Sequence, residues 1–203
     1  MKILKKLPNS KENIHMDLIT NGWVPMKEPK NVVSAILLSV PLMLVNAILT
    51  IGVINIFSTI SLSDFGQTSD SFTLTINLSV ILWLFLLLIL HEFLHLIFIP
   101  NFIKSDKTFV GITMFGGFVI TEEALSKSRY ILITIAPFII ISVILPLLLS
   151  VFGLLTPILK FLILLNSLAS SVDMLNLLLI IKQIPKNAIL KSNGPYTYWK
   201  HVQ

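Results

Sequence analysis

The sequence predicts an all-α integral membrane protein with four transmembrane helices, with a possible small β-hairpin between the second and the third. Of its 203 residues, 55% are hydrophobic and only 12% are charged, whereas soluble domains usually carry about 25% charged residues. Four apolar runs are each long enough to cross about 30 Å of hydrocarbon. The chain has no cysteine, which excludes a disulfide framework and a thiolate metal site.

The four runs follow one another in a single membrane domain, residues 1–203. We expect helices at about 32–57, 77–99, 130–152 and 157–181, with a cytoplasmic linker over 100–129. The first run begins too late for a secretory signal peptide, because a polar stretch precedes it. Pro41, Pro137 and Pro146 lie within the runs, and membrane helices tolerate proline, often with a kink.

The placement of lysine predicts how the chain is oriented in the membrane. Fourteen of the 15 basic residues fall on one side of a four-helix chain, and Lys160 is the exception. The linker 58–76 carries only Asp64 and Asp70. By the positive-inside rule, we expect a multi-pass protein of the cell membrane with both termini in the cytoplasm. The net charge of +5 therefore reflects topology rather than a nucleic-acid surface, and the expected partner is the lipid bilayer.

The linker after the second run contains a β-prone segment. Two such stretches over 108–121 flank Gly116 and Gly117, which suits a hairpin turn. One interpretation is a hairpin or interfacial helix that only connects two membrane helices. The other is a sheet edge that dips toward a site and holds an extended substrate by strand addition.

The second run contains the motif H-E-x-x-H, formed by His91, Glu92 and His95. Residues four apart share one face of a helix, so the two imidazoles can bind one Zn²⁺ ion. The intervening Glu92 is then placed to activate a water molecule. Ionisable side chains inside a membrane helix are costly unless they serve a function, so the motif predicts zinc chemistry within the bilayer.

A catalytic zinc ion usually has three protein ligands, so a third must come from elsewhere. Asp173 in the fourth run lies at a depth similar to that of His91, because both descending helices reach these residues just past their midpoints. Zinc ligation would offset the cost of an aspartate there. Glu122 or Glu123 is an alternative that requires the linker to fold back into the membrane. Other candidates lie in the polar segments: His15, Asp106 and His201.

Two asparagines accompany Asp173 in the fourth run. Asn166 and Asn176 lie seven and three residues from it, so all three can share one helix face. They are candidates for binding substrate or for orienting a metal ligand. The alternative is that they form hydrogen bonds between helices, as is common in membrane bundles.

These features together resemble the core of the site-2 proteases, which are intramembrane zinc metalloproteases. The first helix, Gly116-Gly117 and the phrase from Leu125 to Tyr130 are more similar to a bacterial group described as zincin peptidases. The resemblance implies that His91, His95 and Asp173 are the zinc ligands. The spacing from Asn166 to Asp173 matches a site-2 protease motif, although the proline and glycine of that motif are absent.

The function that we expect is an intramembrane zinc metalloendopeptidase, with Glu92 as the general base and Zn²⁺ as the cofactor. It would hydrolyse peptides or single-span membrane proteins near the cytoplasmic side. The alternative is an inactive zinc-binding membrane protein with a regulatory or immunity role, in which Glu92 would be dispensable. A transporter or structural bundle, whose polar residues pair internally, is a third hypothesis.

Overall fold

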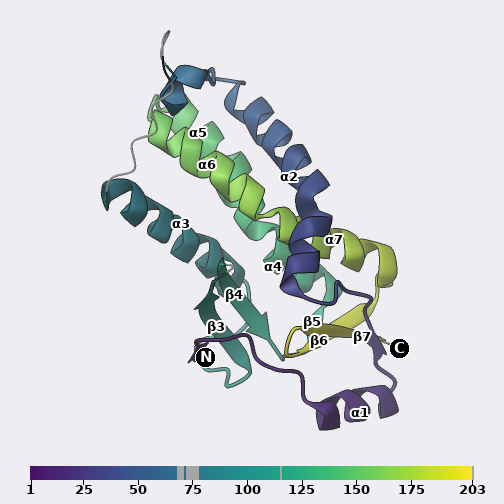
Figure 1. Ribbon diagram of the computed structural model, residues 1–203. Coiled ribbons are helices and arrows are strands. Elements are labelled where there is room, and N and C mark those ends of the chain that lie inside the picture. The colour runs from purple at the N-terminus through teal and green to yellow at the C-terminus, as the bar shows by residue number, and fades with distance from the viewer. Residues whose placement is uncertain (68–70, 72–77, 115, 203) are drawn as a thin grey trace.

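Four helical spans form a bundle, and two small β-sheets lie at one end of it (Figure 1). The structure is a computed structural model that describes residues 1–67, 71, 78–114 and 116–202. The four apolar spans are Val32–Ile54, Leu78–Ile97, Lys127–Val151 and Pro157–Gln183. Within the described residues, the prediction of four helices long and apolar enough to cross a membrane is confirmed, which indicates a multi-pass membrane protein. Asn77, the expected start of the second helix, and Asp70 lie outside the described residues.

The boundaries of several helices follow from local signals in the sequence. The helices are α1 (Glu12–Thr20), α2 (Val32–Ile54), η1 (Leu62–Phe65), α3 (Leu78–Ile97), α4 (Lys127–Pro137), η2 (Phe138–Ile144), α5 (Leu145–Val151), α6 (Pro157–Ala169) and α7 (Ser171–Gln183). Asn31 caps α2 by accepting a hydrogen bond from the Ser34 N–H, and Ser126 caps α4 in the same way from Arg129. Pro157 begins α6, where its missing N–H costs nothing.

Polar side chains on one face of α2 bind it to the fourth span. Ser39 and Asn46 are fully buried, although they lie in the middle of an apolar helix. The Ser39 hydroxyl is 3.1 Å from that of Ser171, and Asn46 donates to the Ser167 carbonyl at 3.0 Å. Such contacts replace the hydrophobic driving force, which is weak between helices in lipid.

The third and fourth spans are both interrupted near their middle. In the third, α4 ends at Pro137 and continues as the π-helical segment η2, because a proline ring cannot donate the hydrogen bond of a regular turn. The fourth breaks at Ser170 between α6 and α7. Asn166 therefore lies on α6, whereas Asp173 and Asn176 lie on α7. Backbone hydrogen bonds from Ser170 to Asn166 and from Met174 to Ser170 continue across the break, and the three residues lie on the same side of the span, as expected.

The strands form two separate sheets. They are β1 (Lys2–Leu4), β2 (Val24–Pro25), β3 (Thr108–Thr113), β4 (Gly116–Thr121), β5 (Leu125–Ser126), β6 (Ala188–Asn193) and β7 (Tyr196–His201). Sheet A has the order β1-β3-β4, with β1 parallel to β3 and β4 antiparallel to it. Sheet B is antiparallel, with the order β2-β7-β6-β5.

The hairpin expected over 108–121 is present, but its turn is not where the glycines suggested. Gly116 and Gly117 are the first residues of β4, and they pair with Thr113 and Ile112 of β3. The glycines are needed inside the strand rather than at the turn. For Gly117 the reason is the close approach of α3, which is described below.

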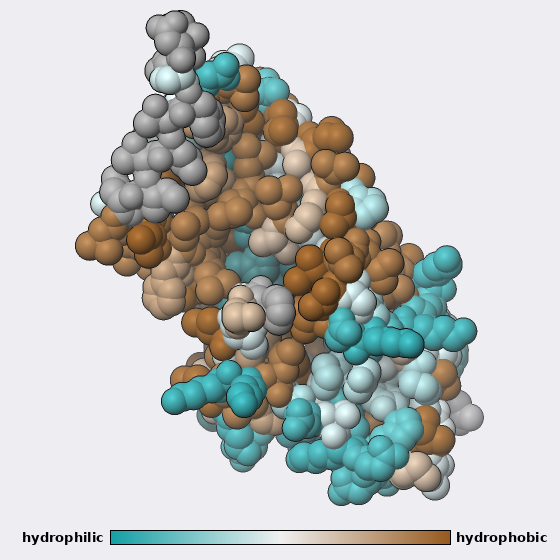
Figure 2. Space-filling view, in the orientation of Figure 1, coloured by the Kyte–Doolittle hydropathy of each residue, from teal (hydrophilic) through white to brown (hydrophobic). Residues whose placement is uncertain are grey.

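Both sheets and both termini lie at the same end of the bundle (Figure 1). That end is largely hydrophilic, whereas apolar residues cover the helices (Figure 2). Sheet B packs on the end of the fourth span through Met26, Ile180, Ile184 and Leu190. The prediction of an all-α protein was wrong in this respect, because sheet B joins an N-terminal strand to a C-terminal hairpin, a pairing that helix periodicity does not reveal.

Candidate metal centre

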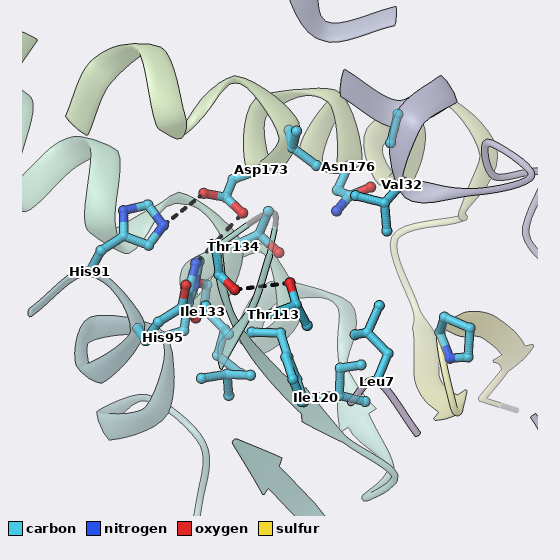
Figure 3. Close-up of a pocket in the computed structure, with 18 of the residues that line it drawn as sticks. Leu7, Val32, His91, His95, Thr113, Ile120, Ile133, Thr134, Asp173 and Asn176 are labelled. Carbon is cyan, nitrogen blue, oxygen red and sulfur yellow. Dashed lines mark hydrogen bonds and ion pairs between the residues drawn. The ribbon is translucent and has the colours of Figure 1, made fainter. Parts of the chain in front are cut away.

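Two histidines form the first half of the site. His91 and His95 lie one turn apart near the end of α3, and both are buried. Their ring centroids are 5.0 Å apart. Both rings turn their Nε2 atoms toward α7, as Figure 3 shows. The spacing of four residues thus places two nitrogen ligands on the face of α3 that meets the fourth span.

Asp173 completes the group from the first turn of α7. Its Oδ2 atom is 3.3 Å from His91 Nε2, and its Oδ1 atom is 3.6 Å from His95 Nε2. One ligand atom from each of the three residues lies within 4.8 Å of the others. Zinc binds His nitrogen and carboxylate oxygen at about 2.0–2.2 Å, so only a small contraction would centre an ion among them.

Hydrogen bonds on the far side of each ring fix the orientation of both histidines. His91 Nδ1 is 2.9 Å from Asn166 Oδ1, and His95 Nδ1 is 2.7 Å from the Ile133 carbonyl. Both partners are acceptors, so each Nδ1 carries the proton and donates it. Each Nε2 faces Asp173 and is the ring nitrogen left to bind a metal ion, which would replace any proton there. The donor set and its orientation therefore fit Zn²⁺.

Asn166 is itself held by the interrupted third span. Its Nδ2 donates to the Ser142 hydroxyl at 2.9 Å and to the Pro137 carbonyl at 3.3 Å. These donations leave Oδ1 to face His91, which fixes the orientation of the amide. The sequence reasoning considered Asn166 as a ligand-orienting residue but missed Ile133, Pro137 and Ser142. The only sequence signal for this arrangement was the spacing of Pro137 and Ser142, five residues apart in an apolar run.

Glu92 lies beside the metal group on the side of α3 that meets sheet A. The first strand residues of β4 approach it so closely that a Cβ atom on Gly117 would lie 2.5 Å from Glu92 Oε1. That distance is far below any normal contact, so a side chain at this position would displace either Glu92 or β4. The carboxylate is thereby confined between α3 and β4, next to the three candidate ligands.

A cavity of about 890 Å³ contains the metal group and Glu92. Its walls come from α3, β4, α4 and the fourth span, and it extends toward the turn between β6 and β7. Figure 2 shows hydrophilic residues at the bottom of a hollow among the apolar helices. Asn176 also lines the cavity but lies farther along α7, beside Val32 (Figure 3). The cavity offers room for a substrate beside the metal group.

The other candidate ligands are not brought to this group. Glu123 accepts a hydrogen bond from Ser105, and Glu122 accepts one from the Gly194 N–H. His15 is bonded to the Tyr198 hydroxyl, and His201 ends β7. Among the described residues, the cluster of metal-binding side chains consists of His91, His95 and Asp173 alone.

Comparison with known proteins places the chain in a family. A search of curated proteins and a search of solved structures each found no match. A sequence model of the family described as "Putative zincin peptidase" matches residues 84–189, which is just over half of the chain. The matched segment includes Glu92 and all three candidate ligands. The chain therefore belongs to this zincin peptidase family.

Proposed function

We propose that the protein is an intramembrane zinc metalloendopeptidase that hydrolyses peptide bonds of membrane-associated substrates. The observation that supports this most is the orientation of the two histidines, each of which is held at Nδ1 and directs its Nε2 atom toward Asp173. Two histidines that only stabilised the bundle would not need a hydrogen bond at Nδ1 to fix the orientation of each ring. The site lies within the candidate membrane spans, in agreement with the resemblance to the site-2 protease core.

The orientation of the chain in the membrane supports cleavage near the cytoplasmic side. Both sheets and both termini share one end of the bundle (Figure 1), and the polar segments at that end carry most of the lysines. By the positive-inside rule, we expect this end in the cytoplasm. The cavity extends from the metal group toward sheet B, so water would enter from the cytoplasm.

The residues of the chain can be assigned to the steps of peptide hydrolysis. Zinc, when bound by His91, His95 and Asp173, supplies a Lewis acid that polarises the scissile carbonyl and acidifies water. Glu92 takes a proton from the attacking water and delivers it to the nitrogen of the leaving amine. Asn166 keeps His91 in the tautomer that binds metal.

The position of β4 supports binding of the substrate in an extended form. β4 is an edge strand of sheet A, packs against α3, and contributes Gly117 beside Glu92. A peptide added alongside β4 would gain backbone hydrogen bonds and would present its carbonyl groups to the metal cavity. Asn176 on the opposite wall is a candidate for a further hydrogen bond to the substrate.

The test compares three proteins purified with their zinc and expressed in the same membranes: wild type, Glu92→Gln and His91→Ala. We expect about one zinc per chain in the first two and a loss of zinc in the third. Of these three proteins, only the wild type should generate new protein N-termini, mapped by mass spectrometry of the membranes. Glu12→Gln, on the exposed side of α1, is the matched control and should behave as wild type.

Each alternative function predicts a different result. If Glu92→Gln still generated the new N-termini, the proposed mechanism would be wrong. If His91→Ala changed the physiology of the cell while Glu92→Gln did not, the protein would act by binding zinc, in a regulatory or immunity role. Less than about a tenth of an equivalent of zinc in the wild type would favour a structural bundle or transporter.

A further inference from the structure

A second cavity lies on the other side of Glu92 from the metal group. It has a volume of about 440 Å³ and is formed between sheet A and the last turns of α3. Apart from Lys5 and Glu92, its walls are apolar, and they include Ile89, Phe93 and Val110. Its volume is within the range of about 300–1,000 Å³ that is usual for ligand sites.

The cavity opens on the surface of the bundle that faces lipid. Ile89 and Phe93 on α3 are 46% and 49% exposed, and they continue the apolar surface of that helix toward its end. Across the opening, Ile3 of β1 and Ile112 of β3 are 78% and 51% exposed. Sheet A thus presents apolar side chains beside a membrane helix, where lipid rather than water is the expected neighbour.

Positive charge surrounds the sheet side of this opening. The N-terminal ammonium group donates to the Ile103 carbonyl, so the start of the chain lies beside the turn that precedes β3. The exposed lysines of these two segments are Lys2, Lys5, Lys6, Lys104 and Lys107. Asp106 is the acidic residue among them. In Figure 2, hydrophilic residues lie directly below apolar ones at this corner.

We propose that this groove binds an anionic phospholipid of the leaflet on the sheet side of the membrane. One acyl chain lies between α3 and sheet A, against Ile89, Phe93 and Ile112. The phosphate group lies among the lysines of β1 and of the turn before β3, whose long side chains can reach the headgroup level. A lipid in this position would cover the face of Glu92 that is turned away from the metal group.

The test uses the full-length protein in nanodiscs and requires no substrate. The probes are phosphatidylglycerol and phosphatidylcholine, each with a photoreactive group on one acyl chain, at equal mole fraction in a phosphatidylcholine bilayer. We expect phosphatidylglycerol to label the peptides containing Ile89–Leu96 and β3 several-fold more than phosphatidylcholine does. Equal labelling by the two lipids would overturn the proposal without any variant.

Two variants test the two parts of the groove. Lys2→Glu combined with Lys5→Glu should reduce labelling by phosphatidylglycerol by about fivefold or more for each lysine, whereas Lys186→Glu, an exposed lysine after α7, should not. Val110→Phe fills the cavity and should abolish labelling of the groove by both lipids. Labelling that is unchanged in both variants would overturn the proposal. None of these results depends on zinc or on peptidase activity, so the test of lipid binding is independent of the test of the proposed function.

Discussion

Gly117 in β4 leaves room for the carboxylate of Glu92, because a Cβ atom at position 117 would lie 2.5 Å from Glu92 Oε1. This close approach brings the edge strand of sheet A next to the proposed general base. Any side chain at this position would have to displace either Glu92 or the strand that we expect to bind the substrate. The glycine is therefore a requirement of the site rather than of the hairpin turn.

We expect Gly117→Ala to lower kcat about 100-fold while zinc remains bound, because a displacement of roughly 1 Å in a catalytic group has an effect of that size. The measurement is the rate of cleavage of a substrate found by N-terminal mapping, together with the zinc content. Gly52→Ala is the matched control, since a Cβ atom there would meet nothing within 4 Å. Wild-type kcat in Gly117→Ala would show that Glu92 tolerates the displacement and would argue against its role.

Asn166→Ala should weaken zinc binding about 10- to 100-fold, which is typical when the partner behind a ligand is lost. The substitution removes the acceptor that is 2.9 Å from His91 Nδ1, so the ring is free to rotate or change tautomer. Zinc affinity is measured by competition with a chelator. Asn176→Ala serves as the control, because Asn176 lines the same cavity whereas the Nδ1 partners of the two histidines are Asn166 and Ile133. This variant should retain wild-type affinity. Equal affinity in both variants would contradict the assignment.

The membrane spans and the candidate ligands could be predicted because each depends on local sequence. Hydropathy over about 20 residues identifies a span, and the four-residue spacing of His91 and His95 places them on one face. Asp173 could be found because charge is rare in apolar runs. The structure places it 3.3 Å from His91 Nε2, a relationship that depth alone had suggested.

The features that were missed depend on contacts between distant segments. Strands of two or three residues, such as β1 and β2, are too short to show a periodic pattern. They form only by pairing with strands that lie more than 100 residues away in the sequence. For the C-terminal hairpin a signal was present, since Gly194-Pro195 places a glycine with positive φ at the first position of a two-residue turn. The π-helical segment after Pro137 had no comparable signal, so the bonds that hold Asn166 could not be foreseen.

Glu28 should make the stability of the protein depend on pH. Burial raises its pKa to about 7, although hydrogen bonds from the Thr197 N–H and hydroxyl act in the opposite direction. Because the pKa in the folded state lies above the usual value of 4.5, folding favours the protonated form. Stability should therefore fall by up to about 3 kcal/mol between pH 4.5 and 7 and level off at higher pH.

Glu28→Gln tests this pH dependence, because glutamine does not ionise. We expect the variant to lose much of the decline in thermal midpoint between pH 5 and 7.5, whatever constant offset results from the altered bonding to Thr197. The exposed Glu12→Gln variant should keep the wild-type profile. A Glu28→Gln protein with an unchanged profile would show that other groups determine the pH dependence.

The ion pair between Lys160 and Asp64 should be important for stability because its ammonium group is buried. Lys160 Nζ is 2.9 Å from Asp64 Oδ2 and 2.7 Å from the Thr59 carbonyl, and the Lys160 side chain is only 8% exposed. Asp64→Asn keeps an oxygen to accept from the Ser61 N–H but leaves the ammonium group unpaired. We expect a loss of about 3–5 kcal/mol, measured by unfolding in detergent.

Combining Asp64→Asn with Lys160→Met should restore most of that loss, since a buried pair replaced as a whole often costs little. The double variant thus separates the cost of an unpaired charge from the value of the pair. An exposed ion pair would contribute at most about 1 kcal/mol. If Asp64→Asn lost no more than this, Lys160 would have to reach water, and η1 would not be fixed to α6 by charge.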